Sequence, residues 1–470
     1  MKIELNTNAP HAAKLLEFVA ALKPDAIPRA AFDNAKRCLL DAIGCGLFGA
    51  SQPWSVIMAA QMLAEKSQGA ATVFGYEQSL SAPAAALCNG TAIHGFELDD
   101  LLPAAIIHPG TVIIPAVLAA AQNHDVSGAQ LLRAIIIGYE VTARISLAMG
   151  TQASHHGFHK TSVVGPVAAA IAASCVLNLN AAQITCAAGI AASMASGLKS
   201  YVASGGGGMV KRMHAGWAAS SGVRAAMLAR DGFTGPSGAL DGRYGLLEVF
   251  GGSAANPVQL TLGLGASWAI NAVWFKVYPI CGWIQGVVQL LGVMREGINQ
   301  GKPFTPDQIK KVVVGTSAFA VNGNSNATPA DTMDAQYSIP YCAALTLTRD
   351  PGDPRAFEAA GYTHPELLAI AARVETRVDD ACEAVYPQRF GSRVQLHLAN
   401  GEVKEALTLD PHGTPADPCD DDELARKFAR LAALSPLKFD SAAIAAIAQA
   451  VNRIDQSANL HDLSQRLRAR

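Results

Sequence analysis

The sequence predicts a mainly α fold, with a large helical domain built from both chain ends and a smaller inserted α+β domain. From about residue 10 to residue 265, apolar residues recur at three- and four-residue spacing, as in amphipathic helices, and strand-like alternation is nearly absent. A β-rich texture begins near Asn271, and the chain turns helical again after Pro411. We therefore expect a helical domain over residues 1–268, an α+β domain over 269–410 and a return to the helical domain over 411–470.

The helical region contains the longest charge-free run of the chain. This run extends from Thr161 to Leu198, is built from Ala, Gly and Ser, and is interrupted by Asn178 and Asn180. A membrane-spanning helix needs about 20 predominantly apolar residues without such interruptions. The run therefore predicts two buried helices that pack closely through small side chains.

Two segments predict the strands of the inserted domain. Residues 310–321 (KKVVVGTSAFAV) are β-rich, and residues 393–409 alternate on either side of Asn400-Gly401, which signals a hairpin. Helical spacing returns in residues 421–434 and 441–454.

Composition excludes several classes of function. The 470 residues are 50% hydrophobic and carry 36 basic against 38 acidic side chains, so a net charge of −2 provides no bulk field for nucleic acid or an anionic membrane. Nine scattered cysteines without a C-x-x-C pair argue against a disulfide framework, a structural zinc or an iron–sulfur cluster. The N-terminus, MKIELNTNAP, lacks the pattern of a secretory signal, so we expect a cytoplasmic location.

Titratable groups are concentrated in NGTAIHGFELDDLLPAAIIHPG, residues 89–110. We expect a helix through IHGFELDD, which would place His94 and Glu97 on one face and Asp99 and Asp100 at its C-terminal end, against the helix dipole. His108 precedes Pro109 at the expected start of the next helix, where free backbone N–H groups could meet an anion. The alternative is a helix–loop–helix with solvated acids and a capping histidine.

A second candidate is HHGFHKTSVVGP, residues 155–166. The adjacent His155 and His156 cannot easily converge with His159 on a metal, and there is no H-E-x-x-H motif. His159, just before an expected helix start near Thr161, is better suited to proton transfer or anion contact, or it is a structural histidine.

A third candidate is SGGGGMVKRMHAGWAA, residues 204–219. Val210 and Arg212 stand where a phosphate-binding loop would need Gly and Ser or Thr, so that motif is absent. We expect a flexible loop that delivers Lys211, Arg212 and His214 to a helix start; the alternative is a mobile surface loop with solvated charges.

The fourth candidate is WFKVYPICGWIQ, residues 274–285, in which Lys276 lies among aromatic and apolar residues. Together, Lys211, Lys276, His108 and His159 suit a small di- or tricarboxylate, with acids and histidines available to move a proton from carbon. No Gly-x-Ser-x-Gly elbow or dinucleotide fingerprint competes with this interpretation.

These segments, in this order, resemble the MmgE/PrpD family, which includes 2-methylcitrate dehydratase, cis-aconitate decarboxylase and iminodisuccinate epimerase. The stretches that carry the resemblance are NGTAIHGFELDD with HPG, GFHKTSVVGP, KRMHAGWAASSG, DGFTGPSGALDGRYGLLEVFGG and FKVYPICGW, and they cover nearly the whole chain. The resemblance implies a mostly helical domain with a smaller lid domain, homodimers, and catalysis without a metal or organic cofactor.

The resemblance also implies which residues form the site. The family's first acidic position falls on Glu97, and its HP-motif histidine falls on His108. Three departures weaken the case for cis-aconitate as the substrate: Leu101 replaces a threonine, Gln285 replaces a histidine, and Ala320 stands where the decarboxylases have a tyrosine. The expected catalytic residues are His108, His159, Lys211 and Glu97, and the expected substrate-binding residues are Lys276, His94, Arg212, His214 and Gln285.

Three functions follow as hypotheses. The first is a cofactor-independent lyase that abstracts a proton alpha to a carboxylate and expels water or carbon dioxide. The second is an epimerase or isomerase of a dicarboxylate such as iminodisuccinate, and the third is a non-catalytic carboxylate-binding paralogue. We expect no nucleic acid or membrane as a partner, and Asp99 and Asp100 are expected to support and orient the site.

Overall fold

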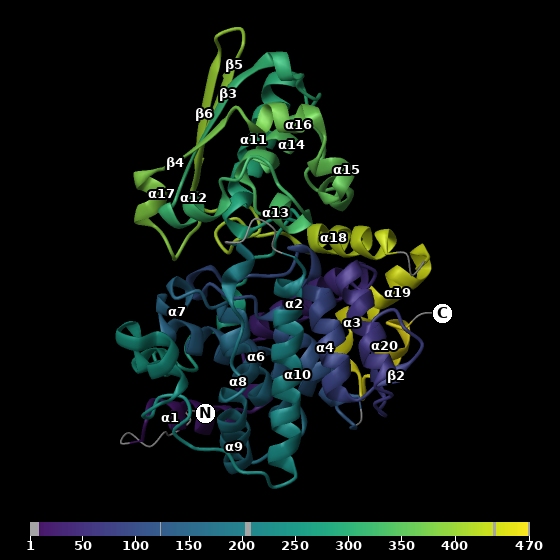
Figure 1. Cartoon of the computed structure of the whole chain (residues 1–470). Coiled ribbons are helices and arrows are strands. Elements are labelled where there is room, and N and C mark those ends of the chain that lie inside the picture. Colours follow the sequence, from purple (N-terminus) through teal and green to yellow (C-terminus); the bar gives the residue numbers. More distant parts are fainter. Residues whose placement is uncertain (1–8, 123, 203–207, 436–438, 469–470) are drawn as a thin grey trace. The chain divides into compact units, whose positions relative to one another are not determined.

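The computed structural model describes residues 9–122, 124–202, 208–435 and 439–468 (Figure 1). The chain divides into two compact units. The first unit comprises Met1–Lys199, Lys211–Val273 and Asp420–Arg470, and the second comprises Ser200–Val210 and Trp274–Cys419.

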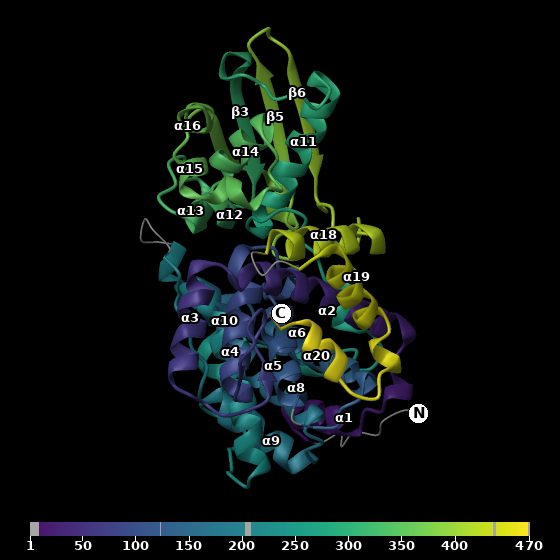
Figure 2. The same ribbon diagram turned by 90° about the vertical axis from the view of Figure 1, so that its right-hand side faces the viewer.

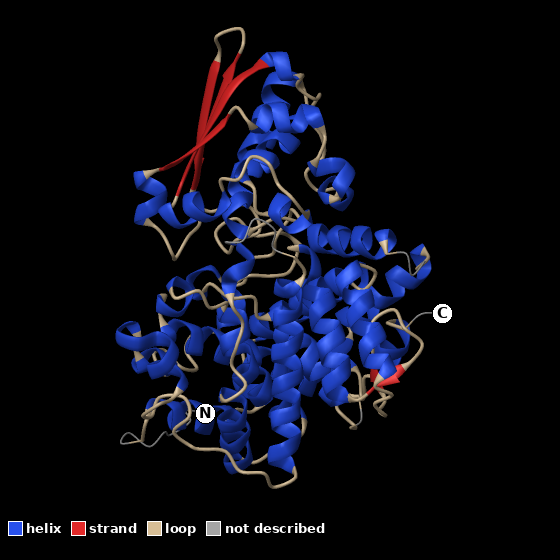
Figure 3. Ribbon diagram, in the orientation of Figure 1, coloured by secondary structure: helices blue, strands red, loops and turns tan. Residues whose placement is uncertain are grey.

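The first unit consists of helices and one small pair of strands, as the colouring in Figure 3 shows. Most of the described chain is helical, which confirms the predicted mainly α class. The two-residue strands β1 (Ala71–Thr72) and β2 (Ser79–Leu80) pair antiparallel. Its helices are α1 (His11–Ala21), α2 (Arg29–Gly49), α3 (Pro53–Ala64), α4 (Ala82–Ile93), α5 (Gly110–Ala121), α6 (Gly128–Met149), α7 (Gln152–His155), α8 (Lys160–Val176), α9 (Ala181–Ala192), α10 (Val210–Arg230), α18 (Asp421–Leu434), α19 (Ser441–Asn452) and α20 (His461–Arg466).

Helix α8 lies at the centre of this unit, and all of its residues are buried. It contacts α5, α6 and α9, so the charge-free run forms two helices that pack against each other, as expected. Helix α10 approaches α8 and α4 closely: a Cβ built on Gly222 would lie 2.3 Å from the Cβ of Ala169, and one on Gly216 would lie 2.2 Å from the carbonyl oxygen of Leu87. Glycine is needed at both positions because a larger side chain would push the helices apart.

No helix in the described part of the chain has the length and apolar character needed to cross a membrane. All nine cysteines are free thiols in the structure.

The second unit combines a four-stranded sheet with helices (Figure 2). The strand order is β4-β3-β5-β6, with β3 and β4 parallel and the other pairs antiparallel. Helix α11 contacts β5 and β6, and α14 contacts β4. The elements are α11 (Gln285–Asn299), β3 (Ile309–Thr316), α12 (Ala318–Asn324), α13 (Thr332–Gln336), α14 (Ile339–Thr348), α15 (Ala359–Tyr362), α16 (Pro365–Ala371), β4 (Val374–Val378), α17 (Asp380–Ala384), β5 (Ser392–Leu398) and β6 (Val403–Thr408).

The hairpin between β5 and β6 forms where Asn400-Gly401 predicts it. Gly401 has a φ of +90°, and its N–H donates to the carbonyl oxygen of Leu398 at 3.1 Å. The side-chain oxygen of Asn400 accepts from the N–H of Glu402 at 2.9 Å. Glycine tolerates the positive φ without strain, so the turn fixes the register of the two strands.

Candidate active site

The segment after helix α4 is not the continuous helix that its sequence predicts. Helix α4 ends at Ile93 and is followed by a short 3-10 turn, His94–Phe96. Glu97 then has a φ of +57°, in the left-handed region that residues with a side chain seldom adopt. The expected helix through IHGFELDD is therefore wrong: Asp99 and Asp100 lie in irregular chain, and tertiary contacts hold the side chains of His94 and Glu97.

The carboxylate of Glu97 binds two cations from the start of helix α10. The ammonium of Lys211 and Nη1 of Arg212 both donate to Oε1 of Glu97, the latter at 2.9 Å. All three side chains are 1% exposed. The guanidinium of Arg212 also lies over the ring of Trp54, 5.2 Å from its centroid. Helix α10 thus presents Lys211 and Arg212 to a buried carboxylate. Much of the glycine-rich loop expected before this helix falls on residues 203–207, which lie outside the described residues.

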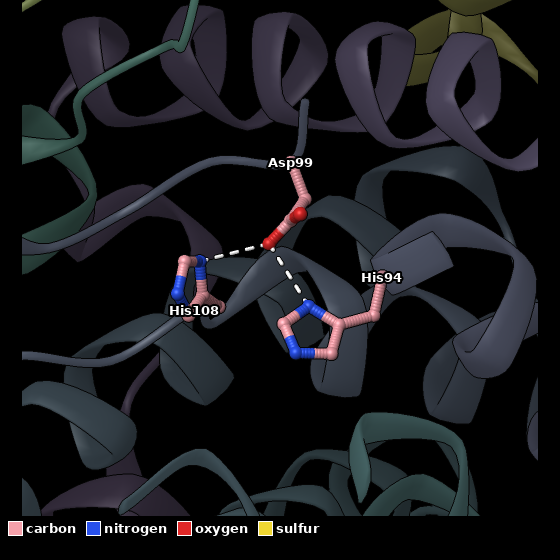
Figure 4. A group of neighbouring side chains, drawn as sticks. All are labelled: His94, Asp99 and His108. Atoms are coloured by element: carbon pink, nitrogen blue, oxygen red, sulfur yellow. Dashed lines mark hydrogen bonds and ion pairs between the residues drawn. The ribbon is translucent and has the colours of Figure 1, made fainter. Parts of the chain in front are cut away.

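Asp99 connects two of the predicted histidines (Figure 4). Its Oδ2 lies 3.1 Å from Nδ1 of His94 and 2.8 Å from Nδ1 of His108. Asp99 and His94 are buried, whereas the His108 side chain is 13% exposed. The ligand atoms of these three residues lie within 4.8 Å of one another, so they could bind either a metal ion or one another through hydrogen bonds.

Asp100 anchors the start of helix α5, which directly follows His108. Its Oδ1 accepts from the N–H of Gly110 at 2.9 Å, and its Oδ2 accepts from the hydroxyl of Tyr139 at 2.5 Å. Burial raises the pKa of Asp100 to about 7, while its hydrogen bond with Tyr139 acts in the opposite direction. The backbone oxygen of Asp100 lies 2.9 Å from Nδ1 of His108, so this residue contacts both the helix start and the histidine.

His159 lies beside three other histidines. Its Nδ1 is 3.0 Å from Nδ1 of His214, and its ring stacks on that of His94 with the centroids 5.7 Å apart. The ring centroid of His108 lies 6.4 Å away. His159 occupies the N-cap position of helix α8, directly before Lys160, and its backbone N–H donates to the carbonyl oxygen of Gly197 at 2.9 Å.

These imidazoles favour the neutral form. Burial, followed by the nearby charge of Lys211, lowers the pKa of His94 to about 3 and the pKa of His214 to about 4. The same two causes, with further repulsion from neighbouring histidines, hold the pKa of His159 well below its usual value. Neutral imidazoles can accept a proton, which is the property that a general base requires.

Lys160 is a buried residue of this region that sequence reasoning missed. Its ammonium donates to the carbonyl oxygens of Ser146 at 2.8 Å and Gly150 at 2.9 Å. Burial lowers its pKa to about 7. The available signal was a lysine that directly follows His159 and precedes a long charge-free run.

The remaining predicted residues lie in other surroundings. Lys276 and Gln285 belong to the second unit and are buried there. The amide of Gln285 donates to the carbonyl oxygens of Tyr278 at 2.8 Å and Ile280 at 3.2 Å, so it supports the turn that follows Lys276. Leu101 and Ala320, at two of the departures from the family pattern, are buried apolar residues of the first and second unit. His155 and His156 are exposed, unlike the buried His159.

The first unit therefore combines several groups that suit carboxylate chemistry. The rings of His94, His108, His159 and His214 lie beside one another, and Lys211 acts on three of them, His94, His159 and His214. The formal charges of Glu97 (−1), Asp99 (−1), Lys211 (+1) and Arg212 (+1) sum to zero, so the buried cations are compensated within the cluster. Cations held in this way can contact an anionic group, and a neutral imidazole beside them can exchange a proton with it.

Comparisons with known proteins show the family to which the chain belongs. Residues 13–259 match the model of the MmgE/PrpD N-terminal domain, and residues 278–453 match that of the MmgE/PrpD C-terminal domain. The chain is 31% identical to the cis-aconitate decarboxylase-like protein oryM of Aspergillus oryzae over 96% of each chain. It is 28% identical to the cis-aconitate decarboxylase of Aspergillus terreus over 91% of this chain and 90% of that protein. It is 29% identical to the human cis-aconitate decarboxylase over 73% of this chain and 71% of that protein. The two domain matches together span most of the sequence, and the chain belongs to the MmgE/PrpD family.

Proposed function

We propose that the protein is a cofactor-independent lyase of the decarboxylase or dehydratase type that acts on a small di- or tricarboxylate. The relatives named cis-aconitate decarboxylase support a lyase and favour a tricarboxylate substrate. In this proposal a proton moves at the carbon alpha to a carboxylate, and carbon dioxide or water leaves.

The observation that carries the proposal is the group of neutral imidazoles beside Lys211. His159 and His108 are the groups proposed to move the proton, because their rings lie 6.4 Å apart and His159 has a lowered pKa. Lys211 and Arg212 supply positive charge for the substrate carboxylates and the developing enediolate, and Glu97 holds both cations in place. Lys276 is proposed as a further carboxylate-binding cation.

The test is turnover by metal-stripped protein with cis-aconitate, citrate-like and malate-like acids. Products are identified by proton NMR, and released carbon dioxide is measured separately. We expect at least one acid to give a new unsaturated product, and His108→Gln to reduce its rate by about 100- to 10,000-fold. His155→Gln is the matched control, because His155 is exposed. Unchanged acids across the whole panel would contradict the proposal.

A second candidate function is an epimerase, favoured by the two imidazoles of His108 and His159 on separate segments of the site. Two such groups could exchange a proton on opposite faces of a carbon while nothing leaves. In deuterium oxide, an epimerase would wash deuterium into recovered dicarboxylate without forming an alkene. Alkene or carbon dioxide without that exchange would exclude it.

The assembly and location of the enzyme are part of the same proposal. We infer a homodimer that works in the cytoplasm without a metal or organic cofactor, as the resemblance to the family implies. Light scattering tests the dimer, and a monomer at micromolar concentration would contradict it. Activity that survives chelation and exhaustive dialysis would support cofactor independence. Tight binding of a carboxylate in calorimetry without turnover would instead indicate a non-catalytic paralogue.

A further inference from the structure

The hydrogen-bond partners of two ring nitrogens fix where the hydrogens lie on His94 and His108. Nδ1 of His94 faces Oδ2 of Asp99, and Nδ1 of His108 faces the same oxygen and the carbonyl oxygen of Asp100. An ionised carboxylate and a carbonyl oxygen accept hydrogen bonds and do not donate them. Both Nδ1 atoms must therefore carry hydrogen, and in the neutral imidazoles the lone pair lies on Nε2.

The Nε2 atom of His94 is buried and has no hydrogen-bond partner within the described part of the chain. Figure 4 shows this nitrogen on the far side of the ring from Asp99. Buried polar atoms nearly always have a partner, so an unsatisfied ring nitrogen indicates a position that a ligand atom can fill. The neighbours of the His94 ring include His108 and His159, the two groups of the proposed proton transfer.

We propose that Asp99 is a positioning residue that holds His94 and His108 in the same tautomer, and that Nε2 of His94 accepts a hydrogen bond from a hydroxyl or carboxylic acid group of the bound substrate. The first statement concerns the protein alone. The second rests on the proposed function, because it requires a carboxylate substrate at this cluster.

Metal binding by the same three side chains is the competing arrangement. A metal ion would need the lone pair of each Nδ1 atom, together with Oδ2 of Asp99. Nδ1 of His108 would then face the carbonyl oxygen of Asp100 at 2.9 Å with no hydrogen between them. Hydrogen bonds from both imidazoles satisfy both acceptors, so the geometry favours them over the metal.

The tautomers can be read directly by long-range ¹H–¹⁵N NMR of protein labelled with ¹⁵N-histidine, in the absence of substrate. We expect His94 and His108 to carry hydrogen on Nδ1 in the wild type. Asp99→Ala removes the oxygen that both rings face, so His94 loses the acceptor at its Nδ1 and should populate the Nε2–H form, while the carbonyl oxygen of Asp100 can still hold hydrogen on Nδ1 of His108. Asp100→Asn is the control at the neighbouring carboxylate, because the side chain of Asp100 contacts Gly110 and Tyr139 rather than a ring nitrogen.

The result that overturns the tautomer assignment is Nε2–H on both rings of the wild type, or no change at His94 in Asp99→Ala. Binding of one equivalent of Zn²⁺ by the wild type, lost in Asp99→Ala and accompanied by Nε2–H tautomers, would also overturn it in favour of a metal site. The tautomers are measured without turnover, so this outcome is independent of the proposed lyase activity.

His94→Asn tests the substrate contact. The asparagine amide can still donate to Asp99 in place of Nδ1–H, but it offers no acceptor at the position of Nε2. We expect the variant to fold, to keep the tautomer of His108, and to lose about 100-fold or more in kcat/KM on the accepted substrate. Activity within a few-fold of the wild type in this folded variant would overturn the contact while leaving the lyase proposal intact.

Discussion

The ion pairs of Glu97 in the first unit are buried, whereas those on the sheet of the second unit are partly or largely exposed. Glu97 and Lys211 are each 1% exposed, but the side chains of Arg393 and Glu405, which pair between β5 and β6, are 27% and 44% exposed. Exposed pairs contribute little to stability because water screens them. Buried charges lose their hydration and need complete compensation. The buried cluster is therefore held together by mutual compensation of its charges, whereas the pairs on the sheet are compensated largely by solvent.

The two regions also differ in what their charges act on. On the sheet, charged side chains contact other charged side chains and solvent. In the first unit, Lys211 lies close enough to His94, His159 and His214 to lower the pKa of each. Burial is the larger cause of each lowered pKa and the charge of Lys211 adds to it, so the three imidazoles favour the neutral form at neutral pH.

The largest effect is expected on activity, from His159→Gln. If His159 is the base in the cluster, the change should reduce turnover by about 100- to 10,000-fold while leaving folding nearly intact. Steady-state kinetics on the accepted substrate, normalised to folded protein, measure the effect. A lower melting temperature with activity within a few-fold per folded molecule would show that His159 is structural.

A large effect on stability is expected from Glu97→Gln. The glutamine keeps the shape but removes the charge that faces Lys211 and Arg212, and breaking a buried ion pair costs about 3–5 kcal/mol. Urea unfolding monitored by circular dichroism gives the change in free energy of unfolding. Glu405→Gln makes the same chemical change at an exposed carboxylate and should leave the unfolding midpoint nearly unchanged. Equal effects of the two substitutions would remove the distinction between the regions.

Much of the local structure could be predicted because its signals are local. The spacing of apolar residues marks α6, and the Asn400-Gly401 dipeptide marks the hairpin. The conformation of Glu97 could not be predicted in this way, because glutamate is a good helix former and no neighbouring residue signals a left-handed backbone. The side chain of Glu97 contacts Lys211 and Arg212, which lie more than 100 residues later in the chain. The left-handed backbone of Glu97 therefore occurs together with long-range contacts, which the helix propensity of nearby residues does not predict.

The site could be predicted only in part for the same reason. Periodicity does not reveal which segments become neighbours, so Lys211, Lys276, His108 and His159 are grouped by their chemistry, and the resemblance to a family then implies their roles. The contact between His159 and His214 and the burial of Lys160 depend on how α8 and α10 pack. Neither sequence spacing nor composition carries that information.

A smaller effect is expected on the pH dependence of stability. The pKa values of His94 and His214 fall to about 3 and about 4 in the folded state, against about 6.5 in the unfolded chain. The unfolded state therefore binds more protons below pH 6.5, and stability should be full above that pH and fall on acidification toward pH 3–4. The slope is at most about 1.4 kcal/mol per pH unit for each imidazole.

Asp100 provides a second test, because its contribution to stability changes with pH in the opposite direction to that of His94 and His214. Its pKa is raised to about 7 from about 3.9 in the unfolded chain, so its contribution to stability decreases as the pH rises from about 4 to 7. Urea unfolding at several pH values between 7 and 4 should show a steeper loss on acidification in Asp100→Asn and a shallower loss in His214→Gln. Identical slopes in both variants and the wild type would show that these groups do not titrate as the buried cluster requires.

The smallest effect is expected from Arg393→Gln on the sheet of the second unit. Arg393 Nε donates to Oδ2 of Asp379 at 2.8 Å, but Asp379 also caps helix α17, where its Oδ1 accepts from the N–H groups of Ala381 and Cys382. The aspartate therefore keeps hydrogen-bond partners after the substitution, and the partly exposed pair should contribute about 1 kcal/mol or less. Unfolding of the wild type and variant at low and high salt measures the difference, which should shrink as ions screen the charges. A loss as large as that of Glu97→Gln would mean that this pair stabilises the second unit as strongly as the buried cluster stabilises the first. A loss insensitive to salt would mean that Arg393 contributes through packing rather than through its charge.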